Sequence, residues 1–184
     1  MNTNRKVIWI TRTALFLAIT IIAQFIGKSI GVPIIGQLFT GILVNMSLIV
    51  AGIVVGLSSG CTIAVLSPLL AFLFGIMELV PAIPVVMVGN LAIVILTALI
   101  YKRFSNGSLD VFAQNLLQFV GMVIGAAAKC ALMWLSALYI LPLFITVPPI
   151  IVTSFGIIQA VTGSAGGLLA LIIIPSLLKI KRHE

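Results

Sequence analysis

The chain has 184 residues, of which 62% are hydrophobic and 7% are charged. Soluble domains carry about 25% charged residues, so this composition excludes a water-soluble domain and predicts an integral membrane protein. The net charge of +7 does not indicate nucleic-acid binding, because the basic residues are sparse and lie at the ends of apolar segments rather than on one exposed face.

Six apolar segments predict an all-α, six-transmembrane-helix bundle that forms a single domain over residues 1–184. In chain order, the predicted spans are residues 13–30, 38–57, 61–77, 84–101, 114–141 and 152–178. Residues 58–60 predict a tight turn between the second and third spans, and Pro68 predicts a kink in the third. The fifth and sixth segments exceed the length that a bilayer requires, so we expect them to tilt or to project from it.

Basic residues flank these spans unevenly. Eight of them precede the first span or follow the fourth and sixth: Arg5, Lys6, Arg12, Lys102, Arg103, Lys179, Lys181 and Arg182. The positive-inside rule then places both termini in the cytoplasm, with only Lys28 outside. Residues 103–110 become the main cytoplasmic loop, in which Asn106-Gly107-Ser108 is interpreted as a turn rather than a glycosylation site.

The three outer loops, residues 27–37, 77–84 and 141–150, are rich in proline and glycine yet apolar. A loop in water would be more polar. We expect these loops either to pack on the protein as lids over a site or to lie among the lipid headgroups.

Enzymatic chemistry finds little support. Gly27-Lys28-Ser29 resembles the end of a nucleotide-binding P-loop, but Ile22 occupies the position of the required first glycine. The one histidine and three acidic residues of the chain cannot be assembled into a catalytic set, so we expect neither catalysis nor a cofactor. Cys61 and Cys130 lie within or at the edge of apolar segments and predict neither a disulfide framework nor a metal site.

Lys129 lies in the middle of the fifth span, too far from either interface to reach it easily. Gly121 and Gly125 share its helix face, and such a face of small residues is typical of helix–helix contacts. A lysine there requires a partner or a wet cavity. Two interpretations are open: Lys129 pairs with Glu78 or backbone carbonyls, or it lines a ligand cavity and faces an anionic or polar group.

Further polar and aromatic residues gather toward the outer half of the spans. Each alone is typical of an interhelical hydrogen bond or an aromatic belt, but together they predict a small outward-facing pocket with aromatic walls and a few polar groups. The candidate substrate-binding residues are Lys129, Asn90, Asn45, Gln37, Trp134, Tyr139, Gln159 and Glu78.

Small residues dominate the inner halves. Gly52, Gly56 and Gly60 follow each other at intervals of four, which favours close packing within the chain. Ala14 and Ala18 form a similar flat strip on the first span. We interpret the glycine pairs as internal packing, whereas the alanine strip could dock another subunit.

The ordered motifs RTALFLAIT (12–20), GQLFTGILVNMSLIVAGIVVGLSSG (36–60), SPLLAFLFGI (67–76) and PVVMVGN (84–90) resemble the S components of energy-coupling factor vitamin transporters. The resemblance covers nearly the whole chain. It implies a bacterial cell-membrane protein that captures a vitamin from outside with high affinity. It also implies that Ala14 and Ala18 dock a transmembrane coupling subunit driven by two cytoplasmic ATPases.

Within that family, the sequence at residues 40–45 (Thr-Gly, then Val-Asn) and at residues 89–90 (Gly-Asn) is most similar to the pantothenate-specific members. Lys129 would then pair with the carboxylate, while Asn45, Asn90 and Gln159 would serve the amide and hydroxyls.

Other functions stay open. A neutral vitamin such as pyridoxine or hydroxymethylpyrimidine would stack on Trp134 and Tyr139, with Lys129 structural. A non-transporting membrane scaffold would need no pocket. A stand-alone secondary transporter would show internal repeats or intramembrane acids, for which Glu78 is the one candidate.

Overall fold

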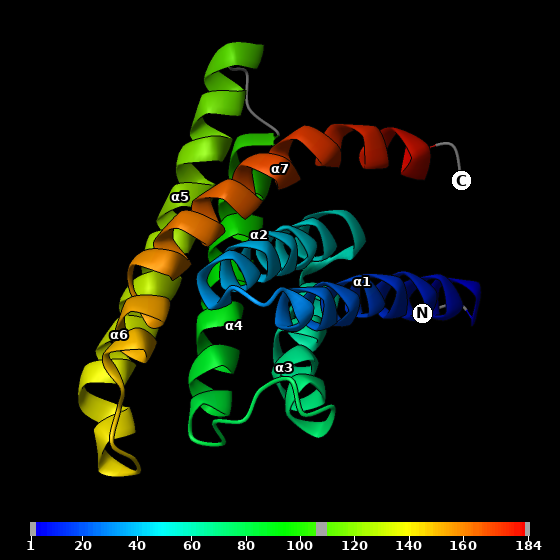
Figure 1. The fold of residues 1–184 in the computed structure, drawn as a ribbon. Helices are drawn as coiled ribbons and strands as arrows, with labels where there is room; N and C mark the ends of the chain where they lie inside the picture. Colours follow the sequence, from blue (N-terminus) through cyan, green and yellow to red (C-terminus); the bar gives the residue numbers. More distant parts are fainter. Residues whose placement is uncertain (1–2, 106–109, 183–184) are drawn as a thin grey trace.

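The computed structural model describes residues 3–105 and 110–182, and these are almost entirely helical (Figure 1). The α-helices are α1 (Thr3–Ser29), α2 (Pro33–Val50), α3 (Leu57–Leu73), α4 (Ala82–Ser105), α5 (Val111–Leu135), α6 (Pro149–Phe155) and α7 (Ile157–Arg182). Short π-helices η1 (Ala51–Val55) and η2 (Ser136–Ile140) extend α2 and α5, and a 3₁₀ turn η3 (Leu141–Leu143) follows. The described residues contain no strand, which confirms the all-α prediction; the expected turn at Asn106-Gly107-Ser108 lies outside them.

Five helical stretches in the described part of the chain are long and apolar enough to cross a membrane. They are Asn4–Ser29, Pro33–Val55, Ala82–Ser105, Val111–Leu143 and Pro149–Ile180. Helix α3, at 17 residues, is a shorter apolar helix. These helices indicate a membrane-embedded protein, whereas the sixth span and the cytoplasmic placement of the termini stay predictions.

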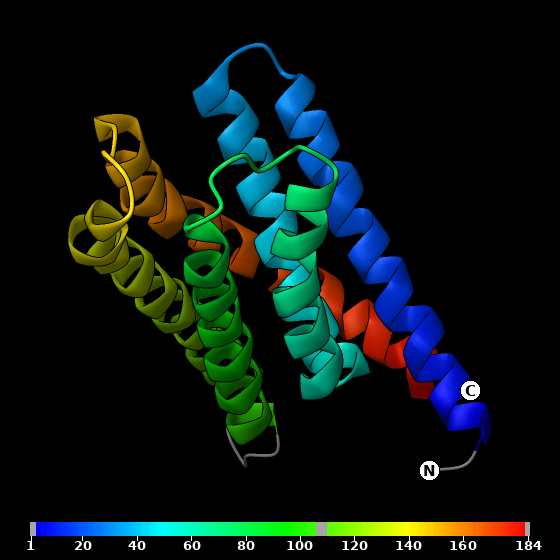
Figure 2. The same ribbon diagram turned by 90° about the horizontal axis from the view of Figure 1, so that it is seen from below.

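The helices run back and forth between two ends of the bundle. Figure 2 shows the start of α1, the end of α4 and the end of α7 toward one end, and the α1–α2 turn and α3–α4 connection toward the other. Helix α2 packs along α1 and α7, and α4 packs along α3 and α5. The second half of α2 therefore lies at the centre of the bundle.

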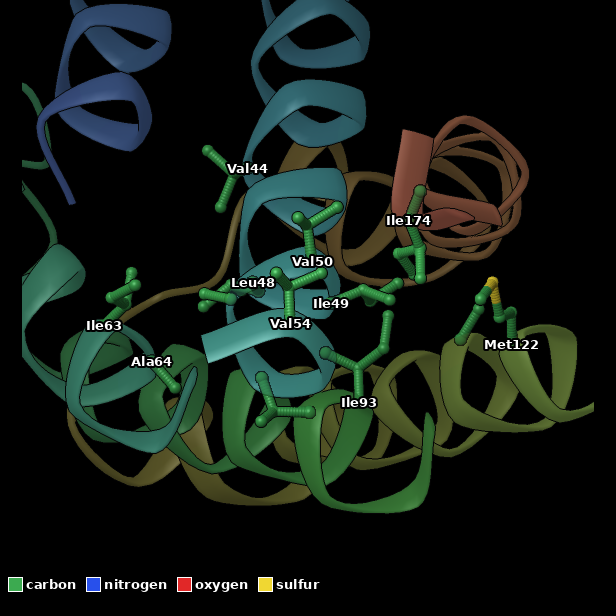
Figure 3. Close-up of a cluster of buried hydrophobic side chains, with 14 residues drawn as sticks. Val44, Leu48, Ile49, Val50, Val54, Ile63, Ala64, Ile93, Met122 and Ile174 are labelled. Atoms are coloured by element: carbon green, nitrogen blue, oxygen red, sulfur yellow. The ribbon is translucent and has the colours of Figure 1, made fainter. Parts of the chain in front are cut away.

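The apolar core surrounds that second half of α2 (Figure 3). Leu48 and Ile49 are fully buried, and they belong to one cluster with Ile63 of α3, Ile93 of α4 and Ile174 of α7. Lipid tails are as apolar as these side chains, so burial from lipid brings little hydrophobic gain. The core must therefore be held by close packing.

Glycines allow this close packing. A Cβ atom on Gly60 would lie 2.7 Å from Cγ1 of Val94 and 2.8 Å from Cα of Gly52. The predicted packing role is thus confirmed for Gly52 and Gly60, but it is wrong for Gly56, where a Cβ atom would meet nothing within 4 Å. Ala14 and Ala18, by contrast, are exposed on α1.

The turn between the second and third spans was misplaced. Residues 58–60 are helical, and the chain turns instead at Gly56, whose φ of 144° is a conformation that favours glycine. Helix α3 consequently begins at Leu57 and ends at Leu73, four residues earlier at each end than the predicted third span. Gly75, with φ of 66°, lies in the connection that follows.

One predicted loop and one predicted span also differ from the structure. Most of residues 27–37 are helical, so the α1–α2 connection shrinks to residues 30–32. The sixth segment is not one helix, because it breaks at Gly156 into α6 and α7. A side chain at 156 would meet the Trp134 ring of α5 at 3.1 Å, so glycine lets the break pack against α5.

Candidate functional site

A cavity of about 550 Å³ lies among the helices near the α1–α2 turn. This volume is within the range of small-molecule sites, roughly 300–1,000 Å³. Lys28, Gly31 and Pro33 line it and are exposed, so the mouth lies beside this turn. Apolar side chains cover much of the wall: Val44, Ile76, Met77, Val86, Phe155 and Ile158.

Lys129 lies at the inner wall of this cavity and is only 3% exposed. Its Nζ donates hydrogen bonds to Oδ1 of Asn45 at 2.7 Å and to Oδ1 of Asn90 at 2.8 Å. Nδ2 of Asn45 donates in turn to Oγ1 of Thr162 at 3.4 Å. The cluster thereby joins helices α2, α4, α5 and α7, and the prediction that Lys129 points into the bundle is confirmed.

The chemistry of lysine fixes the direction of the two asparagine amides. An ammonium group donates hydrogen bonds and accepts none, so both Oδ1 atoms must face it and both Nδ2 groups must point away. Asn90 lines the cavity, and its Nδ2 has no hydrogen bond to any residue that the structure describes. Lys129 uses two of its three protons on the asparagines. The inner wall therefore offers hydrogen-bond donors to an occupant.

No acidic side chain among the described residues pairs with Lys129. Glu78 pairs instead with Lys28, with 3.2 Å between Oε1 and Nζ. Asp110 caps the N-terminus of α5, where its side chain accepts from the backbone N–H of Ala113. Among the described residues, Lys129 therefore bonds to the side chains of Asn45 and Asn90 rather than to the predicted partners, Glu78 or backbone carbonyls.

Two amide contacts do not replace a counter-ion. Hydrogen bonds to a charged group contribute about 1.5–3 kcal/mol each. Removing an ammonium ion from water costs several kcal/mol even after the protein relaxes. Lys129 is thus positioned and partly solvated by Asn45 and Asn90, and an anion in the cavity would supply the missing charge.

Glycines explain how Lys129 comes so close to α4. A Cβ on Gly125 would lie 2.7 Å from Cγ2 of Thr97, and one on Gly89 would lie 3.3 Å from Cγ of Lys129 itself. Gly121 likewise packs against Ile100. The predicted small-residue face of the fifth span is therefore the face that packs on α4.

Of the other predicted polar residues, two line the cavity and two lie one contact away from its lining. Gln37 and Gln159 line it, and Oε1 of Gln37 lies 2.8 Å from Oγ of Ser154 across the α2–α6 contact. Glu78 lies outside the lining, but its partner Lys28 lines the mouth. Asn45 is likewise outside the lining, one contact behind Lys129.

The predicted aromatic walls are wrong. Trp134 and Tyr139 are 46% and 70% exposed, and neither belongs to the cavity lining. A helix turns by about 100° per residue, so Trp134 is rotated about 140° from Lys129. The aromatic ring in the lining comes instead from Phe155, at the end of α6.

Sequence reasoning also missed a lining residue, Gln24 of α1. It lies in the apolar second half of α1. The available signal was its spacing from Gly27 and Lys28, which places all three on one helix face. Both of these residues also line the cavity.

The α3–α4 connection is fastened to α1 beside the mouth. Lys28 donates a hydrogen bond to the carbonyl of Gly75 and forms the ion pair with Glu78. The rings of Phe25 and Phe74 lie 5.7 Å apart between centroids. Ile76 of this connection lines the cavity, so the connection closes part of its wall.

Comparison of the chain with models of protein families, with curated proteins and with solved structures gave no match.

Proposed function

We propose that this chain captures an anionic small molecule within a membrane, as the substrate-binding subunit of an energy-coupling factor vitamin importer, and that the molecule is pantothenate. The observation that carries the proposal is Lys129, which lines the cavity with its Nζ held by two amide oxygens and with no acidic partner in the described part of the chain.

The chemistry of the inner wall fits a carboxylate. A carboxylate oxygen accepts hydrogen bonds only, and the free donors here are the third proton of Lys129 and Nδ2 of Asn90. The apolar wall formed by Val44, Val86 and Ile158 suits the methyl groups of the pantoyl end.

A neutral ring vitamin such as pyridoxine or hydroxymethylpyrimidine is the less favoured substrate. That alternative depended on stacking between Trp134 and Tyr139, and both side chains lie outside the cavity lining. It also left Lys129 without a role for its charge.

The membrane arrangement that accompanies this function has six spans, with α3 as the short one. Both termini lie in the cytoplasm of a bacterial cell, because the basic residues of the N-terminus, the end of α4 and the end of α7 then share one side. The exposed strip of Ala14 and Ala18 on α1 docks the transmembrane coupling subunit, and two ATPases supply the energy.

The test is ligand binding by the purified chain in detergent. Thermal unfolding is measured with pantothenate and with pantothenol, which replaces the carboxylate by an alcohol, and with pyridoxine, hydroxymethylpyrimidine, riboflavin, thiamine, biotin and folate. A ligand at a thousandfold excess over its Kd stabilises the folded state by about 4 kcal/mol, so a true ligand raises the melting temperature clearly.

We expect pantothenate to raise the melting temperature and pantothenol to have a much smaller effect. An equal response to both compounds would contradict the role of Lys129. A response to pyridoxine or hydroxymethylpyrimidine alone would establish the neutral-vitamin alternative, and a folded, monodisperse chain that responds to no compound would favour a scaffold.

A further inference from the structure

Gln24 and Gln159 line the cavity from α1 and α7. The side-chain oxygen of each is buried and has no hydrogen-bond donor among the residues that the structure describes. A buried acceptor without a donor is costly, so the partner of each oxygen has to come from whatever occupies the cavity. Such an atom in a cavity wall calls for an explanation.

The other amides of the site do not share this feature. Oδ1 of Asn90 accepts from Lys129, and Oε1 of Gln37 lies within hydrogen-bond distance of Ser154. Unpartnered hydroxyl oxygens also occur at Ser47 and Ser67, but these residues are outside the cavity lining. Within the described lining, unpaired buried oxygens therefore belong to Gln24 and Gln159.

We infer that Gln24 and Gln159 form an acceptor subsite, which binds the hydroxyl or N–H donors of a ligand whose acidic end contacts Lys129. This inference rests on the proposed function. It adds the residues that bind the end of the ligand opposite to its carboxylate. The torsion of a glutamine amide is broad, so its oxygen turns toward the cavity when a donor arrives. The ligand class is an acid that also carries hydrogen-bond donors at its opposite end.

The position of both residues agrees with this role. Gln24 shares a face of α1 with Gly27, where a Cβ atom would collide with Thr40 of α2, so the close α1–α2 contact holds that face at the cavity. Gln159 lies in the first turn of α7, directly after the break at Gly156. The two amides thus enter the wall from helices that both pack on α2.

The experiment measures binding of two probes to the full chain in detergent by calorimetry. The probes are pantothenate and its analogue that lacks both hydroxyls but keeps the carboxylate. The variants are Gln24→Leu and Gln159→Leu. Gln114→Leu is the matched control, because Gln114 lies near the start of α5 and bonds the carbonyl of Phe104, outside the cavity lining. Melting temperatures without ligand are recorded for every variant.

We expect each cavity variant to bind pantothenate about tenfold more weakly, or weaker still, while the control keeps its affinity. Without ligand, the melting temperature of the cavity variants stays the same or rises, because leucine removes an unpaired buried oxygen. The hydroxyl-free analogue binds the unchanged chain about tenfold more weakly than pantothenate, and Gln24→Leu weakens it no further.

Two outcomes overturn the subsite alone. In one, both cavity variants bind pantothenate as the unchanged chain does. In the other, both probes lose affinity equally and the ligand-free melting temperature falls, which is the result of a structural glutamine or of one paired to a cavity water. Absence of pantothenate binding by the unchanged chain overturns the proposed function together with this inference.

Discussion

Helix α2 passes through two regions that are packed in opposite ways. Its second half, around Leu48 and Ile49, packs against apolar side chains of the core cluster. Its first half, with Gln37 and Gly41, borders the cavity, where polar groups are left with unused hydrogen-bonding capacity. Asn45 lies between the two regions and bonds to Lys129.

The contrast follows from the bilayer as a solvent. An apolar side chain loses little when it moves from protein to lipid, so the core gains stability only from fit. A polar group in the same environment gains or loses several kcal/mol according to whether it is paired. The core is therefore complete without a ligand, whereas the cavity is the region where an added molecule brings the largest gain.

Removal of the Lys129 ammonium has the largest expected effect on the cavity. In Lys129→Met, a bound carboxylate would lose its counter-ion, so we expect more than about a hundredfold loss of pantothenate affinity, measured by calorimetry. The ligand-free melting temperature should not fall, because an uncompensated buried charge is removed. Lys179→Met, at an exposed position of α7, is the control and should keep full affinity. Full affinity in Lys129→Met would contradict the anionic ligand.

Truncation of a core side chain should lower the stability of the fold and leave ligand affinity unchanged, which is the opposite of the Lys129→Met result. Ile63 is fully buried, and Ile63→Ala leaves a void that costs about 2–5 kcal/mol of unfolding free energy. We expect a clear drop in melting temperature and little change in ligand affinity at temperatures where the variant is folded. Ile172→Ala, at a position 65% exposed on α7, should change neither property. A selective loss of affinity in Ile63→Ala would mean that the two regions are coupled.

Asn90→Asp would place a carboxylate directly beside Lys129. The new side chain supplies the counter-ion that the described part of the chain lacks, so it competes with an acidic ligand. We expect roughly tenfold weaker pantothenate binding together with a higher ligand-free melting temperature. Asn115→Asp, at an exposed position of α5, tests for a general effect of charge and should change little. Tighter binding in Asn90→Asp would contradict the proposed role of Lys129.

The ion pair at the mouth should matter least. The side chains of Lys28 and Glu78 are 47% and 84% exposed, and exposed pairs contribute little. We expect Glu78→Gln to change pantothenate affinity by less than about threefold, and the difference to shrink further in high salt. A tenfold change would instead assign Glu78 a direct role in binding.

The sequence predicted the features that depend on composition and helix periodicity. The helical class, the inward direction of Lys129 and the packing of the glycine faces all follow from spacing along one helix. The turn at Gly56 was misplaced because residues 58–60 look equally like a turn, and a positive φ is not visible in a sequence. Trp134 was assigned to the cavity by depth alone, without regard to its rotation around α5.

What the sequence could not provide is the pairing between helices. Asn45, Asn90 and Lys129 are far apart in the chain, and only the packing of α2, α4 and α5 brings them together. Gln24 was overlooked for the same reason, because its importance comes from an unpaired oxygen and not from its neighbours in sequence.

The one-residue turn at Gly56 has a consequence for the surrounding lipid if α3 is the sixth span. Helix α3 has 17 residues and is about 25 Å long, whereas the hydrocarbon core of a bilayer is about 30 Å thick. Helix α1, with 27 residues, reaches about 40 Å. The hydrophobic length of the protein therefore differs between α3 and α1. Thinning of the bilayer beside α3 costs fractions of a kcal/mol per Å of mismatch. We therefore expect the tilt of the whole bundle in the membrane to depend on the thickness of the bilayer.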